Sequence, residues 1–162
     1  MKLFIVHASS YFRQGLEKKE KIEEIADSFP KNDVVELRYY NPGKVISHKG
    51  FVIDSGGGEI NDGFIRVLLK QREKEYILTG GIFGECHKTA FRDLHIKARG
   101  EVFLFPAQAI YGKEVDLETI RKAYNPNADI YLDGRLAFEG ADKCEIRVFS
   151  TNENLFEFLR ER

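Results

Sequence analysis

The sequence predicts an α/β protein, in which three layers, α/β/α, are built around a central and mostly parallel β-sheet. Short apolar runs, typical of buried strands, alternate along the chain with stretches whose apolar residues recur at helical spacing. At 162 residues, with 43% apolar and 12% aromatic side chains, the chain is long enough to bury one sizeable core. We therefore expect a single domain spanning 1–162.

The individual elements follow from local patterns. The stretch 41–62 has no clear periodicity and is predicted to be a long irregular loop, of the kind that carries function or moves. Apolar residues at helical spacing predict helices around 22–29, 60–68, 86–98, 117–124 and 152–162. Apolar runs predict strands at 33–40, 101–107 and 144–150, and at 2–8 and 75–80, which we expect side by side in the middle of the sheet.

A β-hairpin is predicted near the C-terminus. The sequence IYLDGRLAF at 130–138 places Asp133-Gly134 between two apolar runs. This dipeptide is favoured in tight type I′ turns because both central residues need a positive φ. The hairpin is either a structural addition or an arm that pairs with another subunit, and its open strand edges favour a homo-oligomer.

Composition argues against several classes of partner. Lys+Arg 25 against Asp+Glu 26 gives a net charge of −1, so no overall field attracts nucleic acid or anionic lipid. No apolar run approaches the ~20 residues that span a bilayer, so we expect no membrane association and a cytoplasmic location. The two cysteines form neither a metal-type cluster nor a disulfide framework and are expected to be reduced thiols. No Trp, one Met and abundant Lys and Glu are features of thermophile proteins.

One cysteine occupies a position suited to catalysis. In ILTGGIFGECHKTAF, residues 77–91, a buried strand runs into glycines and then into a helix that begins near Cys86. Backbone N–H groups at such a turn stabilise a thiolate and are expected to lower the pKa of the thiol. The N–H groups of Gly81 and Ile82 could also bind a substrate or a developing oxyanion. The alternative is a small buried side chain that only packs under the sheet.

This segment resembles the nucleophile region of the isochorismatase-like cysteine hydrolases, the superfamily of nicotinamidases, isochorismatases and N-carbamoylsarcosine amidohydrolases. In that family a strand ends in Gly, a cysteine lies six residues later, and a Thr-Ala pair follows in the helix. Gly80, Cys86 and Thr89-Ala90 occupy these positions here, with a Cys-to-Thr spacing one residue shorter than usual. The resemblance implies a Rossmann-like fold and a divergent member of the superfamily.

The resemblance also implies partners for the cysteine. The family has a catalytic Asp at the end of the first strand, where this chain has His7, and a catalytic Lys that corresponds to Lys49, with Lys44 as an alternative. Of the metal-binding Asp and two His of metal-dependent members, only His48 has a counterpart, so no metal and no other cofactor is expected.

His7 leaves two functional interpretations open. A Cys-His pair can exchange a proton near neutral pH, which predicts a metal-independent cysteine hydrolase acting on an amide, carbamoyl or related bond of a small molecule. Alternatively, loss of the family carboxylate produces a catalytically altered pseudoenzyme, or a module that binds a small ligand or a partner. The sequence does not name the substrate.

Overall fold

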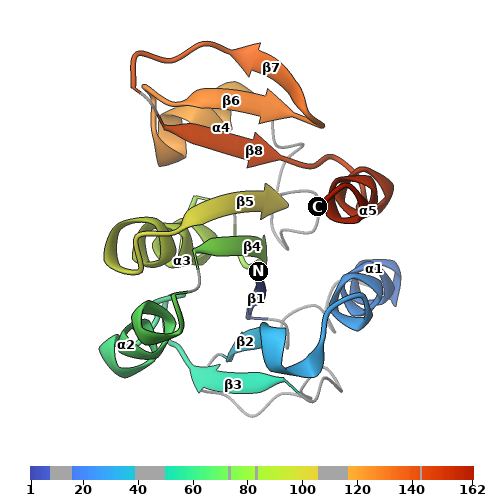
Figure 1. Ribbon diagram of the computed structural model, residues 1–162, viewed down its shortest axis with the longest axis vertical. Helices are drawn as coiled ribbons and strands as arrows, with labels where there is room; N and C mark the ends of the chain where they lie inside the picture. Colours follow the sequence, from blue (N-terminus) through green and yellow to red (C-terminus); the bar gives the residue numbers. More distant parts are fainter. Residues whose placement is uncertain (8–15, 39–49, 73, 83, 106–116, 143) are drawn as a thin grey trace.

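The computed structural model describes residues 1–7, 16–38, 50–72, 74–82, 84–105, 117–142 and 144–162. Its centre is one eight-stranded sheet with the strand order β3-β2-β1-β4-β5-β8-β6-β7. Figure 1 shows these strands stacked from β3 at the bottom to β7 at the top, with helices on both sides of the sheet. The predicted α/β class with a mostly parallel sheet is confirmed.

All strand pairs are parallel except β6–β7. The two strands expected at the middle of the sheet are neighbours there, with Val6 opposite Gly80. The strands are β1 (Lys2–Val6), β2 (Val34–Arg38), β3 (Phe51–Asp54), β4 (Glu75–Gly80), β5 (Glu101–Phe105), β6 (Asp129–Leu132), β7 (Arg135–Phe138) and β8 (Glu145–Val148).

The helices are α1 (Leu16–Asp27), α2 (Asp62–Gln71), α3 (Cys86–Arg92), α4 (Leu117–Tyr124) and α5 (Asn152–Arg160). A π-helical turn, Asp93–Lys97, continues α3. Buried residues of α2, α3 and α4 belong to one core, and those of α1 and α5 belong to a second core on the opposite face. None of the described helices has the length and apolarity that crossing a bilayer requires.

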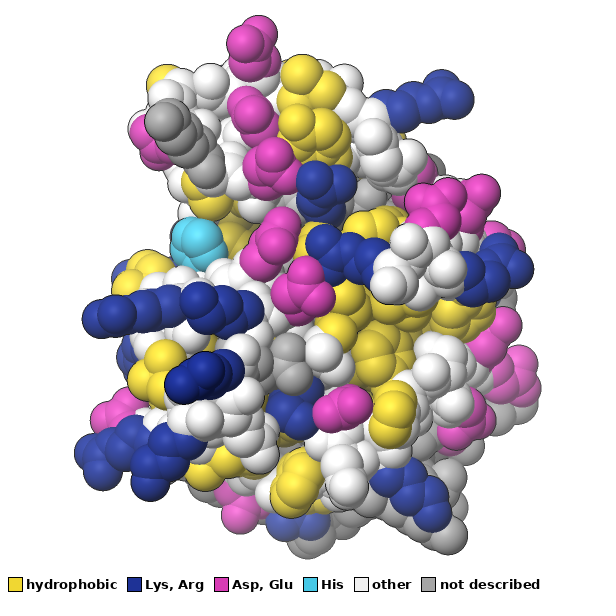
Figure 2. Space-filling model, in the orientation of Figure 1, with side chains coloured by type: hydrophobic (Ala, Val, Ile, Leu, Met, Phe, Trp, Pro, Cys, Tyr) yellow, Lys and Arg dark blue, Asp and Glu magenta, His cyan; other side chains and the backbone are white. Residues whose placement is uncertain are grey.

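The two cores follow from the alternation of side chains along the central strands. In β1, Phe4 and Val6 enter the core under α2 and α3, whereas Leu3 and Ile5 enter the core under α1 and α5. Partly buried side chains extend the second core to the surface, where Figure 2 shows hydrophobic atoms between α1 and α5. In the same view Lys and Arg side chains gather over α2 and α3.

The stretch 41–62 departs from the prediction of an irregular loop. Residues Phe51–Asp54 form β3, which pairs in parallel with β2 and is the edge strand of the sheet. Only Ile53 of this strand is buried, while Phe51 and Val52 are exposed. An edge strand with one buried side chain lacks both the alternation and the apolar run that identify strands from sequence.

The strands β6 and β7 form an antiparallel pair joined by Asp133-Gly134. Both linking residues have positive φ, 48° for Asp133 and 79° for Gly134, which is the backbone of a type I′ turn. The Asp133 carboxylate also accepts hydrogen bonds from the backbone N and the Oγ of Ser150, at 2.9 and 2.5 Å. The turn is therefore tied to the chain that leaves β8.

A buried carboxylate lies in the second core. Glu36 on β2 is 3% exposed and in register with Ile5 of β1, and neither of its carboxylate oxygens has a hydrogen-bond partner among the described residues. Burial raises the pKa of Glu36 to about 7, against an opposing effect of the Arg38 charge. A carboxyl group without a partner in such a place is more stable in its neutral form.

Glu36 is expected to make the protein less stable as the pH rises. In the folded state the carboxyl group keeps its proton up to about pH 7, whereas in the unfolded chain it loses it near 4.5. The free energy of unfolding should therefore fall between these values, by up to about 3 kcal/mol, and level off above them. In the Glu36→Gln variant, the free energy of unfolding measured with urea should no longer fall between pH 5 and pH 8. Glu20→Gln, at an exposed position on α1, is the control, and an unchanged pH dependence in Glu36→Gln would contradict the assignment.

Candidate active site

The strand order reverses direction between β1 and β4. From β1 the chain passes to β2 and β3 on one side, whereas β4 is followed by β5 on the other side. In open α/β sheets, ligands bind at such a reversal, outside the carboxyl ends of the two strands. His7 follows β1 directly and Gly81 follows β4, so a predicted catalytic residue and a predicted substrate-binding residue lie at neighbouring strand ends at this reversal.

Cys86, at the start of α3, lies over the end of β4. A Cβ placed on Gly81 would come within 2.9 Å of both the Cys86 Sγ and the Val6 Cγ1. Gly81 also has a φ of 74°, which other residues rarely adopt. The glycine is therefore required on two grounds, and it brings the thiol next to the strand that ends in His7.

The environment of Cys86 corrects one prediction. Its Sγ accepts a hydrogen bond from the backbone N of Ile82 at 3.0 Å, so in this structure that N–H faces the sulfur. Burial nevertheless raises the pKa of the Cys86 thiol, because desolvation outweighs the hydrogen bonds from Ile82 and His87. The expected low pKa is thus wrong: the side chain is 7% exposed, and at neutral pH the thiol keeps its proton.

His7 is held in a single orientation. Its φ is 50°, its backbone N donates to the Leu37 carbonyl at 2.7 Å, and its Nε2 lies 3.2 Å from the Ser55 carbonyl oxygen. Because a carbonyl can only accept, this contact assigns the proton to Nε2 and leaves Nδ1 as the basic nitrogen. Burial lowers the pKa of His7, so the imidazole is neutral at pH 7.

The predicted lysines cannot be placed beside these groups. Lys49, and Lys44 as its alternative, lie outside the described residues. The structure therefore places His7, Gly81, Ile82 and Cys86 at the carboxyl ends of β1 and β4.

A carboxylate that sequence reasoning overlooked belongs to the site. Glu59 follows β3 and accepts hydrogen bonds from the backbone N of Gly56 and Gly57, at 2.7 and 2.6 Å. Partial burial acts to raise the pKa of Glu59, but these hydrogen bonds and the attraction of His7 outweigh it and lower the pKa. A carboxylate that senses His7 is suited to stabilise an imidazolium. The only feature of the sequence that points to Glu59 is its position directly after three glycines.

The loop that carries Glu59 packs directly on Cys86. A Cβ on Gly58 would lie 2.0 Å from the Cys86 carbonyl oxygen, and Gly58 has a φ of 89°. The far end of the loop is fixed by Asp93, whose Oδ2 accepts a hydrogen bond from the Ile60 backbone N at 2.8 Å. The loop and the start of α3 therefore form one packed unit.

A Tyr-His pair supports the other side of the thiol. His87 is fully buried, and its Nε2 lies 3.4 Å from the Leu78 carbonyl oxygen while its Nδ1 lies 2.6 Å from the Tyr124 hydroxyl. Burial lowers the pKa of His87 to about 4, so the neutral ring donates from Nε2 and the Tyr124 hydroxyl donates to Nδ1. The same hydroxyl accepts from the Gly84 backbone N. Helix α4 thereby holds the turn between β4 and Cys86.

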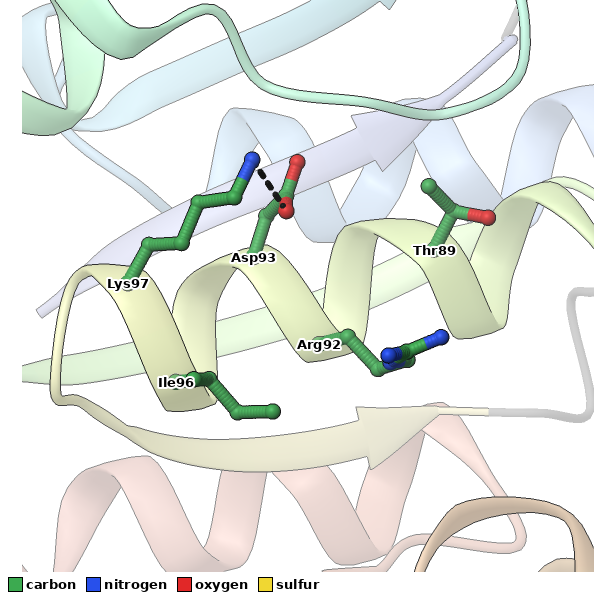
Figure 3. Close-up of a pocket in the computed structure, with 5 residues that line it drawn as sticks. All are labelled: Thr89, Arg92, Asp93, Ile96 and Lys97. Carbon is green, nitrogen blue, oxygen red and sulfur yellow. Dashed lines mark ion pairs between the residues drawn. The ribbon is translucent and has the colours of Figure 1, made fainter.

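A hollow of about 300 Å³ lies on the opposite side of α3 from these groups and is lined by Thr89, Arg92, Asp93, Ile96 and Lys97. Figure 3 shows Lys97 extended toward Asp93, with which it forms an ion pair of 2.9 Å, while Arg92 and Ile96 point away from this pair. Because Asp93 also holds the Glu59 loop, we assign this cluster a supporting role.

Replacing Gly58 tests the packing of the loop on Cys86. Gly58→Ala should lower the free energy of unfolding by more than Gly134→Ala does, because both glycines have similar positive φ but only Gly58 faces a neighbour within 4 Å. The shared backbone cost should exceed about 1 kcal/mol in each variant. Iodoacetamide should also react faster with Cys86 in Gly58→Ala, measured in a Cys144→Ser background. Equal stability losses and equal alkylation rates in the two variants would show that the loop does not press on Cys86.

Among the described residues, no group of three or more His, Cys, Asp and Glu side chains is arranged to hold a metal ion. Comparison of the chain with models of protein families, with curated proteins and with solved structures finds no match.

Proposed function

We propose that this protein is a cysteine hydrolase that cleaves an amide, carbamoyl or related bond of a small molecule without a metal ion. The observation that carries the proposal is the Cys86 thiol seated over Gly81 at the carboxyl ends of β1 and β4, with a neutral His7 directly after the neighbouring strand. A nucleophile, a base and backbone N–H groups at one such set of strand ends suit acyl transfer.

Because the resting thiol is protonated, the mechanism needs a base at the moment of attack. The Cys86 sulfur forms a bond to the substrate carbonyl carbon while its proton passes to Nδ1 of His7. The carbon–nitrogen bond then breaks, and His7 returns the proton to the leaving amine. Water attacks the resulting thioester, releasing the acid and restoring the Cys86 S–H.

Further groups stabilise charge in this scheme. Glu59 faces the imidazolium that forms on His7, since each of the two groups shifts the pKa of the other toward its charged form. The Ile82 N–H supports the sulfur, and the N–H of Gly81 is assigned to the oxyanion. Lys49 keeps its proposed role as a stabilising cation.

A second candidate is a binding module of the same fold that does not turn over its ligand. It is favoured by the burial of Cys86 and by the raised pKa of the thiol, which suit an inert side chain. The two candidates differ in whether Cys86 accepts an acyl group.

Acylation by p-nitrophenyl acetate distinguishes these candidates. In a Cys144→Ser background we expect a burst of about one equivalent of p-nitrophenolate and a mass increase of one acetyl group, both absent in Cys86→Ser. The acylation rate should rise through a pKa below 6.5, since His7 must be neutral to accept the proton. His7→Ala should slow acylation by about 10²-fold or more.

His95→Ala is the matched control, because His95 lies on the other side of α3 against Cys144 and should leave the burst unchanged. Absence of the acetyl adduct in a folded protein, or an acylation rate that does not change in His7→Ala, would count against the hydrolase and favour the binding module.

A further inference from the structure

A second cavity lies at the opposite edge of the sheet from Cys86. It has a volume of about 470 Å³, and the described residues that line it are all charged: Arg72, Lys74, Glu75, Arg99 and Glu101. Glu75 and Glu101 are the first residues of β4 and β5, so the cavity opens at the amino ends of these parallel strands. Nothing in the proposed hydrolase mechanism uses these side chains.

Both arginines that line the cavity have an unusual backbone conformation. Arg72 ends α2 with a φ of 55°, and Arg99 follows the π-helical turn with a φ of 54°. Helices commonly end in this left-handed conformation, but glycine is the usual residue there because a Cβ is unfavourable. Both bends that border the cavity thus carry a long cation where glycine would fit the backbone better. Strained residues of this kind motivate a functional hypothesis.

The described residues of the cavity carry more positive than negative charge. The Glu75 carboxylate forms an ion pair with Arg162, whose guanidinium lies over the rings of Phe103 and Phe158, 5.2 and 4.8 Å from their centroids. Within the described parts of the chain, Arg72, Lys74 and Arg99 form no ion pair with a carboxylate. Among the described residues, three cations therefore face one remaining acidic group, Glu101.

We propose that this cavity binds the phosphate or pyrophosphate group of a small molecule. Arginine forks bind phosphate oxygens in pairs of hydrogen bonds, and Lys74 adds a third positive charge. The volume is in the range of small-molecule sites. None of the described residues that line the cavity is aromatic, so they offer no surface for base stacking, and Glu101 opposes the continuous backbone charge of a nucleic acid.

Isothermal titration with pyrophosphate at low ionic strength tests the proposal on the full chain. Wild type should bind with saturation, and Arg72→Gly and Arg99→Gly should each weaken binding by about tenfold or more. Without ligand, the same variants should keep the wild-type Tm or raise it by up to about 4 °C, since glycine relieves the positive φ. Arg135→Gln, on β7 at the far end of the sheet, should change neither quantity.

The Lys74→Gln variant tests pyrophosphate binding independently if the two glycine variants lose stability. Lys74 does not have a positive φ, and loss of its charge should weaken binding by itself. Unsaturable heat, or unchanged affinity in Arg72→Gly and Lys74→Gln, would overturn the proposal. The proposal would also be overturned if the protein sedimented with vesicles that contain phosphatidic acid but did not bind free pyrophosphate. That result would favour a membrane headgroup as the ligand.

Discussion

The parallel pairing of β1 with β4 is the constraint on which the candidate site depends. With Val6 opposite Gly80, the residues that follow, His7 and Gly81, emerge side by side at the same edge of the sheet. The missing side chain of Gly81 then leaves the space that the Cys86 sulfur and a Val6 methyl group share. A shift of the register by one residue would move every side chain of one strand to the other face and separate these groups.

The thiol is held from three directions, and this accounts for its chemistry. The β4 turn supplies the Ile82 N–H, the loop after β3 presses on the Cys86 carbonyl through Gly58, and α4 fixes Gly84 and His87 through Tyr124. This packing removes water from the sulfur, and the loss of hydration outweighs the hydrogen bonds that favour a thiolate. The same packing that positions the thiol therefore keeps it protonated.

The central strands and the packed face of α3 could be predicted because their patterns are local and strong. Ala90, Phe91, Leu94 and Ala98 recur at helical spacing, and all four are buried. Strand β3 was missed because four residues at a sheet edge bury only Ile53. The raised pKa of the Cys86 thiol comes from burial in the folded chain, where Gly58, more than twenty residues earlier, packs against the Cys86 backbone, and no local pattern contains that information.

The place of β8 in the sheet has a consequence for how the chain acquires its structure during synthesis. This strand is made after β6 and β7 but lies between β5 and β6, so among the described strands it alone joins the hairpin to the rest of the sheet. Until residues 145–148 have left the ribosome, β6 and β7 have no strand through which to join β5. By then the five strands of the order β3-β2-β1-β4-β5 have already been synthesised. Completion of the sheet is therefore a late, non-local step, and a nascent chain that pauses before β8 exposes two open edges to its neighbours.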